Sequence, residues 1–333
     1  MPELDRLIAD VVATTAFSGA VRVDRGGETI VSAAYGYADR AHEIPNSVDT
    51  RFATASGAKG FTALTVVSLV DNGTLDLETT ARSLLGDDLP LVGDDVTVEH
   101  LLAHRSGIGD FLDEDAMGAI TDYALPVPVH RLDRTEAYLE VLDGHPAKAA
   151  AGERFAYCNG GYVILALLAE RATGIAFPEL VQEHVCTPAG LTRTAFFRSD
   201  EPPADVAIGY LSVDSDRSNV LHLPVVGSGD GGLFSTVDDM ARFWAAFAAG
   251  RIVAPAWVDE MVRPRSEEAD GGRSYGLGFW LPRDGSIELE GYDAGVSFRS
   301  AHHRESAHTW TVVSNTSEGA WPLVRALAEH LRK

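Results

Sequence analysis

The pattern of hydrophobic and polar residues changes twice along the chain and divides it into three parts. Near the N-terminus, residues 19–23 and 29–37 have the composition of two strands, which a polar turn would join as a hairpin. From about 56 to 250, apolar residues recur mainly at helical spacing. Past Arg273 the pattern is strand-like again, and we expect strands at 276–281, 287–289, 296–302 and 308–314.

This succession of strands, helices and strands predicts an α+β fold in which one antiparallel sheet is built from both ends of the chain. An amphipathic helix at residues 4–11 and a final helix that begins at Pro322 should flank the sheet. We therefore expect a single catalytic unit over 1–333. Its α/β lobe would comprise 1–50 and 273–333, and its inserted helical lobe 51–272.

One predicted helix carries a candidate nucleophile. Apolar residues lie at helical spacing from Phe61 to Val70, and Gly73 stands where the helix would end, so Ser56 falls in the first turn. Lys59 follows three residues later and shares a helix face with Ser56. An amine that burial holds neutral could take the serine proton, and the N–H groups of the helix start could bind an oxyanion. The alternative is an N-cap serine followed by a solvated lysine.

A second candidate pair, Tyr157 and Asn159, precedes the apolar helix predicted at 161–173. We expect an ammonium at Lys59 to push Tyr157 towards phenolate, so that the tyrosine could move a proton between Ser56 and a leaving group. The Asn159 amide could donate to a substrate carbonyl and accept from the lysine. The alternative is a core tyrosine beside a capping asparagine.

The charge and cysteine content exclude several classes of protein. With 27 basic and 49 acidic residues the net charge is -22, which argues against nucleic acid and anionic membranes as partners. Two cysteines cannot form a disulfide framework and fit a reducing compartment. The first residues lack the basic start of a secretory signal, and no apolar run is long enough to span a bilayer. We predict a cytoplasmic, metal-free and cofactor-free protein, whose oligomeric state the sequence leaves open.

Taken together, the motifs resemble the serine β-lactamase and penicillin-binding-protein superfamily. The resemblance is to its class C-like branch, which includes esterases, D-aminopeptidases, D,D-peptidases and acyltransferases. The matching segments cover nearly the whole chain in the expected order: Ser56-Gly57-Ala58-Lys59, L-L-A-H-R-S-G-I at 101–108, A-G-E-R-F before Tyr157-Cys158-Asn159, and G-G-L-F-S-T-V-D-D-M-A-R-F at 231–243.

This resemblance implies the two-lobed β-lactamase/D,D-peptidase-like fold and a role for each motif residue. Ser56 would be the nucleophile that forms an acyl-enzyme, and Lys59 with Tyr157 would be the general base and acid. Asn159 would position the substrate. The backbone N–H groups of Ser56 and Gly295 would form the oxyanion hole.

The third motif departs from the family pattern. Where relatives place Lys or His, then Thr or a similar residue, then Gly, this chain has Tyr292, Asp293 and Ala294, followed by Gly295. The family's cation and hydroxyl at this motif bind a substrate carboxylate, so their loss argues against penicillin-like and D-alanyl-carboxylate substrates. The alternative is that Asp293 lies in a hydrogen-bonded turn.

Two rival sites are weaker. The segment Gly272-Arg273-Ser274-Tyr275-Gly276 matches G-x-S-x-G, but it lacks the preceding strand and following helix of a nucleophile elbow. His104 and Ser106 are expected to be structural residues of a turn that ends a helix.

The sequence therefore predicts a serine hydrolase that acts on small-molecule acyl substrates. A carboxylesterase or amidase for neutral or amine-bearing substrates is favoured. The alternatives are a D-amino-acid peptidase or weak β-lactamase and, outside the enzymes, a ligand-binding pseudoenzyme on the same fold.

Overall fold

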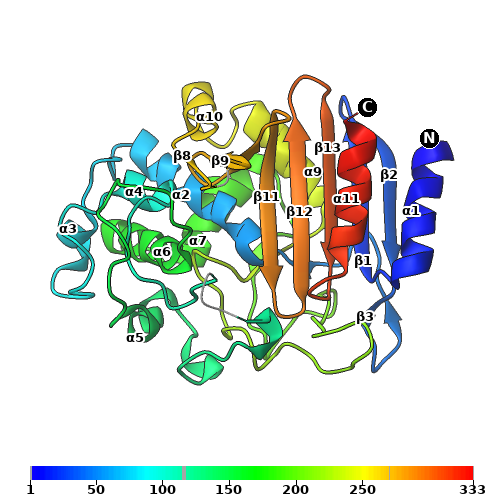
Figure 1. Cartoon of the computed structure of the whole chain (residues 1–333), viewed down its shortest axis with the longest axis horizontal. Coiled ribbons are helices and arrows are strands. Elements are labelled where there is room, and N and C mark those ends of the chain that lie inside the picture. Colours follow the sequence, from blue (N-terminus) through cyan, green and yellow to red (C-terminus); the bar gives the residue numbers. More distant parts are fainter. Residues whose placement is uncertain (1, 115–117, 270, 333) are drawn as a thin grey trace.

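Eight antiparallel strands form the central sheet, in the order β2-β1-β13-β12-β11-β10-β9-β8 (Figure 1). The computed structural model describes residues 2–114, 118–269 and 271–332. The strands of this sheet are β1 (Gly19–Arg25), β2 (Glu28–Tyr35), β8 (Ser266–Glu267), β9 (Arg273–Tyr275), β10 (Trp280–Pro282), β11 (Ser286–Asp293), β12 (Val296–His303) and β13 (His308–Ser314). N-terminal and C-terminal strands thus lie side by side, as the sequence predicts.

Strand pairing across the middle of the sheet joins the two ends of the chain. Gly19 of β1 lies opposite Ser314 of β13, and β13 in turn pairs with β12. Alternate residues of a strand face opposite sides of a sheet, so neighbouring residues belong to different cores. Val312 packs with the terminal helices α1 (Pro2–Thr15) and α11 (Ala320–Leu331), whereas Val313 packs with the helical lobe.

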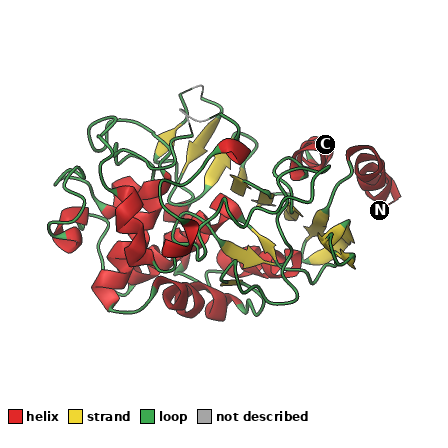
Figure 2. Cartoon of the chain, turned by 90° about the horizontal axis from the view of Figure 1, so that it is seen from below, coloured by secondary structure: helices red, strands yellow, loops and turns green. Residues whose placement is uncertain are grey.

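The helical lobe lies on the side of the molecule opposite to the terminal helices α1 and α11 (Figure 2). Its helices are α2 (Ala58–Asp71), α3 (Ala81–Leu85), α4 (Val98–Leu102), α5 (Leu139–Leu142), α6 (Asn159–Thr173), α7 (Phe177–Val181), α8 (Thr187–Ala189), α9 (Val237–Ala248) and α10 (Pro255–Met261). Short strands β5 (Phe52–Ala53), β6 (Ala195–Phe196) and β7 (Leu233–Ser235) form a three-stranded sheet, and β3 (Tyr37–Asp39) pairs with β4 (Ile44–Pro45).

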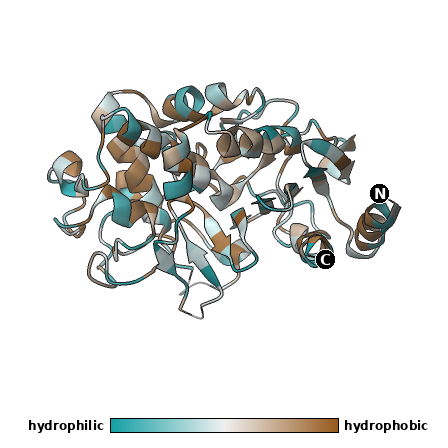
Figure 3. Ribbon diagram, turned by 90° about the horizontal axis from the view of Figure 1, so that it is seen from above, coloured by the Kyte–Doolittle hydropathy of each residue, from teal (hydrophilic) through white to brown (hydrophobic). Residues whose placement is uncertain are grey.

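The helices α2 and α6 are buried almost all round and form the centre of the main hydrophobic core. The ribbon is accordingly hydrophobic over much of the helical lobe (Figure 3). A helix that is apolar on every face is stable only inside a core. Residues at the N-termini of these two helices are therefore held by rigid surroundings.

The strand predicted at 276–281 is wrong in part, because β9 ends at Tyr275 and β10 begins at Trp280. Between them Gly278 has φ +89, and a Cβ on it would lie 2.2 Å from Cβ of Ala63 in α2. The chain turns there because its backbone packs directly against the nucleophile helix. No helix in the described parts of the chain is long and apolar enough to cross a membrane.

Candidate active site

Ser56 lies in one turn of 3-10 helix, η1 (Ala55–Gly57), which joins strand β5 to helix α2. The preceding Ala55 has φ +45, an unfavourable conformation for a residue with a side chain. Gly57 allows the turn to press against the sheet, because a Cβ there would lie 2.5 Å from the Phe298 ring. Gly291 of β11 likewise permits close approach, because a Cβ on it would lie 2.0 Å from the Thr54 backbone oxygen. The nucleophile turn is thus fixed against β11 and β12.

The side-chain amino group of Lys59 lies among three oxygen atoms. Its Nζ is 2.8 Å from Ser56 Oγ, 2.8 Å from Asn159 Oδ1 and 2.9 Å from the backbone oxygen of Asp230. The side chain is 2% exposed, and burial lowers the pKa of Lys59 against the opposing charges of Asp230 and Glu114. The amide and backbone oxygens can only accept hydrogen bonds. A neutral amine would satisfy both with its two N–H groups and keep its lone pair for the Ser56 hydroxyl.

Tyr157 lies beside this pair in the loop before α6, with its ring centroid 5.0 Å from Lys59 Nζ. Burial raises the pKa of Tyr157 well above its ordinary value, and the nearby Glu114 carboxylate adds to the rise, while a hydrogen bond with Ser56 opposes it. The sequence-based expectation of a phenolate is therefore wrong. Lys59 is itself destabilised as a cation, so it provides little charge to ionise the tyrosine.

Asn159 is the first residue of α6 and connects the lysine to the rim of the site. Its Oδ1 accepts from Lys59, and its Nδ2 donates to the Leu112 oxygen at 3.1 Å and to Glu114 Oε1 at 3.0 Å. Asp110 fixes this helix start, since its carboxylate accepts from the N–H groups of Asn159 at 2.6 Å and Gly160 at 2.9 Å. The Asn159 amide is thus fully engaged in the structure as it stands.

The hairpin of β11 and β12 places the third motif. Tyr292 is 41% exposed, and its hydroxyl donates to Glu318 while its ring contacts Trp321, so this side chain points away from Ser56. Gly295 also differs from the expectation, because its N–H donates to Ser317 Oγ at 2.8 Å. The hairpin turn has two residues between Asp293 and Val296, and within it the Gly295 N–H is already engaged by Ser317.

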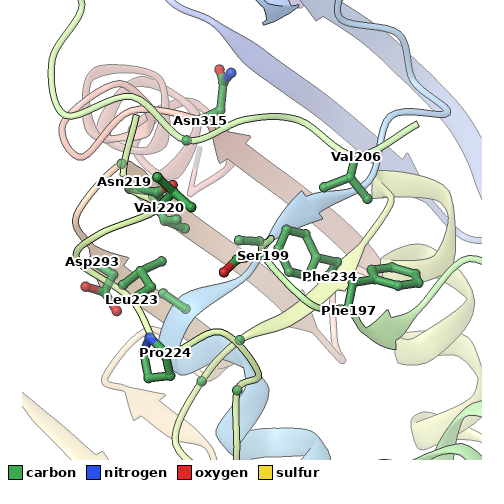
Figure 4. A pocket seen from close by; sticks show the side chains of 18 of the residues that line it. Phe197, Ser199, Val206, Asn219, Val220, Leu223, Pro224, Phe234, Asp293 and Asn315 are labelled. Atoms are coloured by element: carbon green, nitrogen blue, oxygen red, sulfur yellow. The ribbon is translucent and has the colours of Figure 1, made fainter. Parts of the chain in front are cut away.

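Asp293 and Ala294 form the inner side of this turn. Asp293 Oδ1 accepts from the Ala294 N–H at 2.8 Å, as in the turn alternative, and the Ala294 oxygen accepts from Asn219 at 2.9 Å. Asp293 nevertheless lines a cavity (Figure 4). Both aspects hold at once: one carboxylate oxygen stabilises the turn, and the side chain contributes to the wall of the cavity.

This cavity has a volume of about 330 Å³ and reaches the nucleophile turn at Ala55. Its wall is mostly apolar and comes from the irregular segment 197–224 and from β5, β7 and the β11–β12 turn. The apolar side chains include Phe197, Val206, Val220, Leu223, Pro224 and Phe234 (Figure 4). Two acidic residues, Asp230 and Asp293, also line the cavity. The arrangement can hold an apolar group whose polar end faces two carboxyl groups.

Burial and nearby carboxylates disfavour the charged forms of these two carboxyl groups. Burial raises the pKa of Asp293 to about 7, and the neighbouring Asp230 contributes to the rise. Burial likewise raises the pKa of Asp230 to about 6, against the attraction of Lys59. Both groups therefore change charge near neutral pH. In the parts of the chain that the structure describes, no three histidine, cysteine, aspartate or glutamate side chains are grouped to hold a metal ion.

The sequence model described as Beta-lactamase matches residues 4–328. The chain belongs to the beta-lactamase family. A penicillin-binding protein from Bacillus halodurans is similar in structure, with a TM-score of 0.90 and 32% identity over 98% of this chain and 99% of that one. Penicillin-binding protein 4* of Bacillus subtilis (strain 168) is 26% identical over 91% of this chain and 69% of that protein.

Other proteins that are similar to this chain are named for different activities. A D-aminopeptidase of Brucella anthropi is 28% identical over 84% of this chain, which spans 51% of that protein's length. EstCE1, a hydrolase with promiscuous acyltransferase activity, shares the fold with a TM-score of 0.78 at 20% identity, over 97% of this chain and 96% of that one. The chain is a serine hydrolase of the beta-lactamase family with the fold that the sequence predicts.

Three residues of this beta-lactamase-family site escape the sequence analysis: Asp110, Glu114 and Asp230. Asp110 and Glu114 lie in a segment without periodicity, so no local pattern indicates that they face α6. Asp230 stands in the glycine-rich run at 227–232, and such a run could have suggested close backbone approach to the site. The sequence predicts His104 in a turn, where the structure also places it, but its ring in addition packs against Tyr157.

Proposed function

We propose that this protein hydrolyses small esters or amides through an acyl-enzyme on Ser56, with neutral or amine-bearing acyl groups preferred. The observation that carries the proposal is the surrounding of Lys59 Nζ. Lys59 Nζ contacts Asn159 Oδ1, the backbone oxygen of Asp230 and Ser56 Oγ; because the first two can only accept, a neutral amine would keep its lone pair for the Ser56 hydroxyl. A buried amine of lowered pKa in this position is the activating base that a serine nucleophile requires.

In the acylation step, Ser56 Oγ attacks the acyl carbon while its proton passes to Lys59 Nζ. The carbonyl π bond opens to an oxyanion, and the intermediate then collapses with cleavage of the bond to the leaving group. Tyr157, kept as a phenol by burial, gives its proton to the leaving alcohol or amine and recovers one from the Lys59 ammonium. Attack of water on the acyl-enzyme by the reverse sequence would release the acid and restore Ser56.

The oxyanion hole requires a revised second donor. Ser56 N–H remains the first, at the start of the turn that leads into α2. The N–H groups of Ala294 and Gly295 are engaged by Asp293 and Ser317. Backbone groups of a β-strand alternate between its two edges, so the Tyr292 N–H points to the edge opposite to that of Asp293. That edge of β11 passes η1, and we propose the Tyr292 N–H as the second donor.

The cavity supports the substrate preference. An acyl group of apolar character would enter between Leu223, Phe234 and their neighbours, with its polar end towards Asp230 and Asp293. A substrate carboxylate there would meet two like charges, whereas an ammonium group would be attracted. A D-amino-acid peptidase is the second candidate, because the acidic groups suit a free amine and D-aminopeptidases are among the relatives. A ligand-binding pseudoenzyme would need the Ser56 and Lys59 pair to be inert.

The decisive experiment combines labelling and turnover. A serine-directed phosphonate should label the protein once, at Ser56, and the wild type should hydrolyse a p-nitrophenyl ester. Ser56→Ala should abolish both signals, while Ser274→Ala, which removes the serine of the rejected G-x-S-x-G segment, should keep both. Peptide mapping of the label to Ser274 or Ser106 would contradict the assignment. Absence of both labelling and turnover in the wild type would favour the pseudoenzyme.

A further inference from the structure

His104 follows helix α4 and adopts a left-handed backbone conformation, with φ +53. This conformation is unfavourable for residues with a side chain, although histidine, asparagine and aspartate adopt it more often than others. The side chain is 1% exposed and lies beneath the loop that carries Tyr157. A strained, buried and polar residue in this place calls for a physical reason.

The contacts of His104 enclose Tyr157 along the chain. The His104 backbone oxygen accepts from the Ala156 N–H at 2.8 Å, and its Nδ1 accepts from the Cys158 N–H at 3.1 Å. The residues directly before and after Tyr157 are therefore both hydrogen-bonded to one residue. In addition, the His104 and Tyr157 rings pack with their centroids 4.2 Å apart. The backbone and the ring of Tyr157 are thus both set by His104.

The protonation state of His104 follows from these contacts. Because Nδ1 accepts a hydrogen bond, the ring proton of the neutral form lies on Nε2. Nε2 is buried without a hydrogen-bond partner among the described residues, next to the rings of Tyr162 and Tyr275. Burial holds the pKa of His104 well below its usual value. The side chain therefore serves as an acceptor and packing surface and takes no proton itself.

We infer that His104 is a positioning residue for the proposed proton transfer, because it fixes the Tyr157 hydroxyl at Ser56 through the hydrogen bond from Nδ1 to the Cys158 N–H. The inference rests on the role proposed for Tyr157. A displacement of about 1 Å at a reacting group can cost about 100-fold in rate. Tyr157 comes from an irregular loop, so it depends on such a support more than Lys59, which α2 holds.

Two substitutions of His104 by amide side chains test whether the position of the hydrogen-bond acceptor matters. In His104→Asn, Oδ1 lies as many bonds from Cα as Nδ1 does, and asparagine tolerates a positive φ. His104→Gln carries the same amide one bond further out and cannot reach the Cys158 N–H in the same way. We expect His104→Gln to lower kcat for a p-nitrophenyl ester by about 100-fold with KM within about 3-fold, and His104→Asn to stay within about 5-fold of wild type.

The same measurements in a Tyr157→Phe background distinguish positioning from a general loss of structure. If His104 acts through Tyr157, His104→Gln should cost less than about 3-fold once the hydroxyl is absent. Undiminished loss in the Tyr157→Phe background, equal loss in the two amide variants, or an effect on KM alone would overturn the inference. The phosphonate labelling rate of Ser56 is followed in parallel, and thermal melting establishes folding. If His104→Gln does not melt cooperatively, His104→Asn decides: wild-type kcat supports the inference, and a 100-fold loss overturns it.

Failure of the proposed function would be distinguishable from failure of this inference. If the wild type neither turned over the ester nor reacted with the phosphonate, the proposed function would be wrong. If Tyr157→Phe retained wild-type kcat, the proposed role of the tyrosine would be wrong. The inference about His104 alone fails in a different case. There the wild type is active and labelled, Tyr157→Phe loses activity, and His104→Gln and His104→Asn nevertheless behave alike.

Discussion

Asn159 Oδ1 and Lys59 Nζ are 2.8 Å apart, and this contact joins the N-termini of the two most buried helices of the protein, α2 and α6. Burial lowers the pKa of Lys59, and in the neutral form proposed for the base this contact uses one of the two N–H groups of the amine. Any change that alters the number of N–H groups on the side chain at 59 should therefore disturb both the base and the alignment of these helices.

The first prediction concerns Lys59→Arg. A guanidinium stays protonated and cannot accept the Ser56 proton, so kcat should fall by about 10³-fold or more. Steady-state kinetics with a p-nitrophenyl ester measure the loss. Lys148→Arg is the matched control, because Lys148 forms a surface ion pair with Asp113 at 2.7 Å and should keep wild-type kcat. Retention of most of the activity by Lys59→Arg would show that the base lies elsewhere.

The second prediction concerns Tyr157→Phe, which removes one hydroxyl and leaves the ring in its aromatic surroundings. The loss of proton transfer to the leaving group should reduce kcat by about 10²-fold or more. The reduction should be smaller for an ester with a good leaving group than for an amide, because an activated alcohol needs less protonation. Tyr210→Phe, whose hydroxyl accepts from the Arg40 N–H, serves as the control. Equal loss for both substrates would argue against the acid role.

The third prediction is that the enzyme discriminates against substrate carboxylates. We expect kcat/KM for a substrate with a free carboxylate beside the scissile bond to be about 100-fold below that of its methyl ester, because of like-charge contact with Asp293. Asp293→Thr should reduce the preference for the methyl ester over the free acid. A wild type that prefers the free acid, or a ratio unchanged by the substitution, would refute the prediction.

The fourth prediction is the pH dependence of selectivity. The pKa values of about 6 for Asp230 and about 7 for Asp293 mean that both groups become negative as pH rises from 5.5 to 8.5. The kcat/KM ratio of an ammonium-bearing substrate over its neutral isostere should therefore rise through this window. Taking a ratio cancels the titration of Lys59, which acts on both substrates. Asp293→Asn should flatten the upper part of the curve, and an unchanged curve would exclude Asp293 as its source.

The fifth prediction concerns stability. Asp293 has a folded-state pKa of about 7 against an ordinary value of 3.8, so the folded protein binds a proton that the unfolded chain releases above about pH 4. Stability from this group is thus present at acidic pH and lost as pH rises towards 7. Asp293→Asn keeps an oxygen for the Ala294 N–H and removes the charge. The variant should raise the melting temperature more at pH 8 than at pH 5, and the reverse order would contradict the pKa.

The sequence predicts those parts of the site that depend on local geometry. Ser56 and Lys59 are three residues apart on helical turns, so their 2.8 Å contact follows from spacing alone. Tyr157 and Asn159 lie about a hundred residues further along the chain. No local pattern indicates that they join Ser56 and Lys59, and the prediction that they do comes from the resemblance to a family. The sheet built from both termini was predictable because strand-like and helix-like segments are well separated along the chain.

The remaining features of the site cannot be predicted from the spacing of residues along the chain. The pKa of Tyr157 depends on the balance of burial against charge, and burial dominates. The hydrogen-bond partner of the Gly295 N–H depends on the length of the β11–β12 turn. That length follows from the pairing of Asp293 with Val296, which the sequence does not reveal. The cavity is formed largely by segment 197–224, where no regular hydrophobic pattern indicates which side chains face inward.

The pairing of β1 with β13 also sets the order in which the protein can be completed during synthesis. Strand β1 and the nucleophile turn leave the ribosome early, but their neighbours β11, β12 and β13 lie between residues 286 and 314. Long-range pairings form slowly because the intervening chain must first close a large loop. The helical lobe can gather around α2 and α6 in the meantime. Ser56 therefore acquires its walls of β11 and β12 last, and a nascent chain that stops before β11 has no assembled catalytic site to expose to the cell.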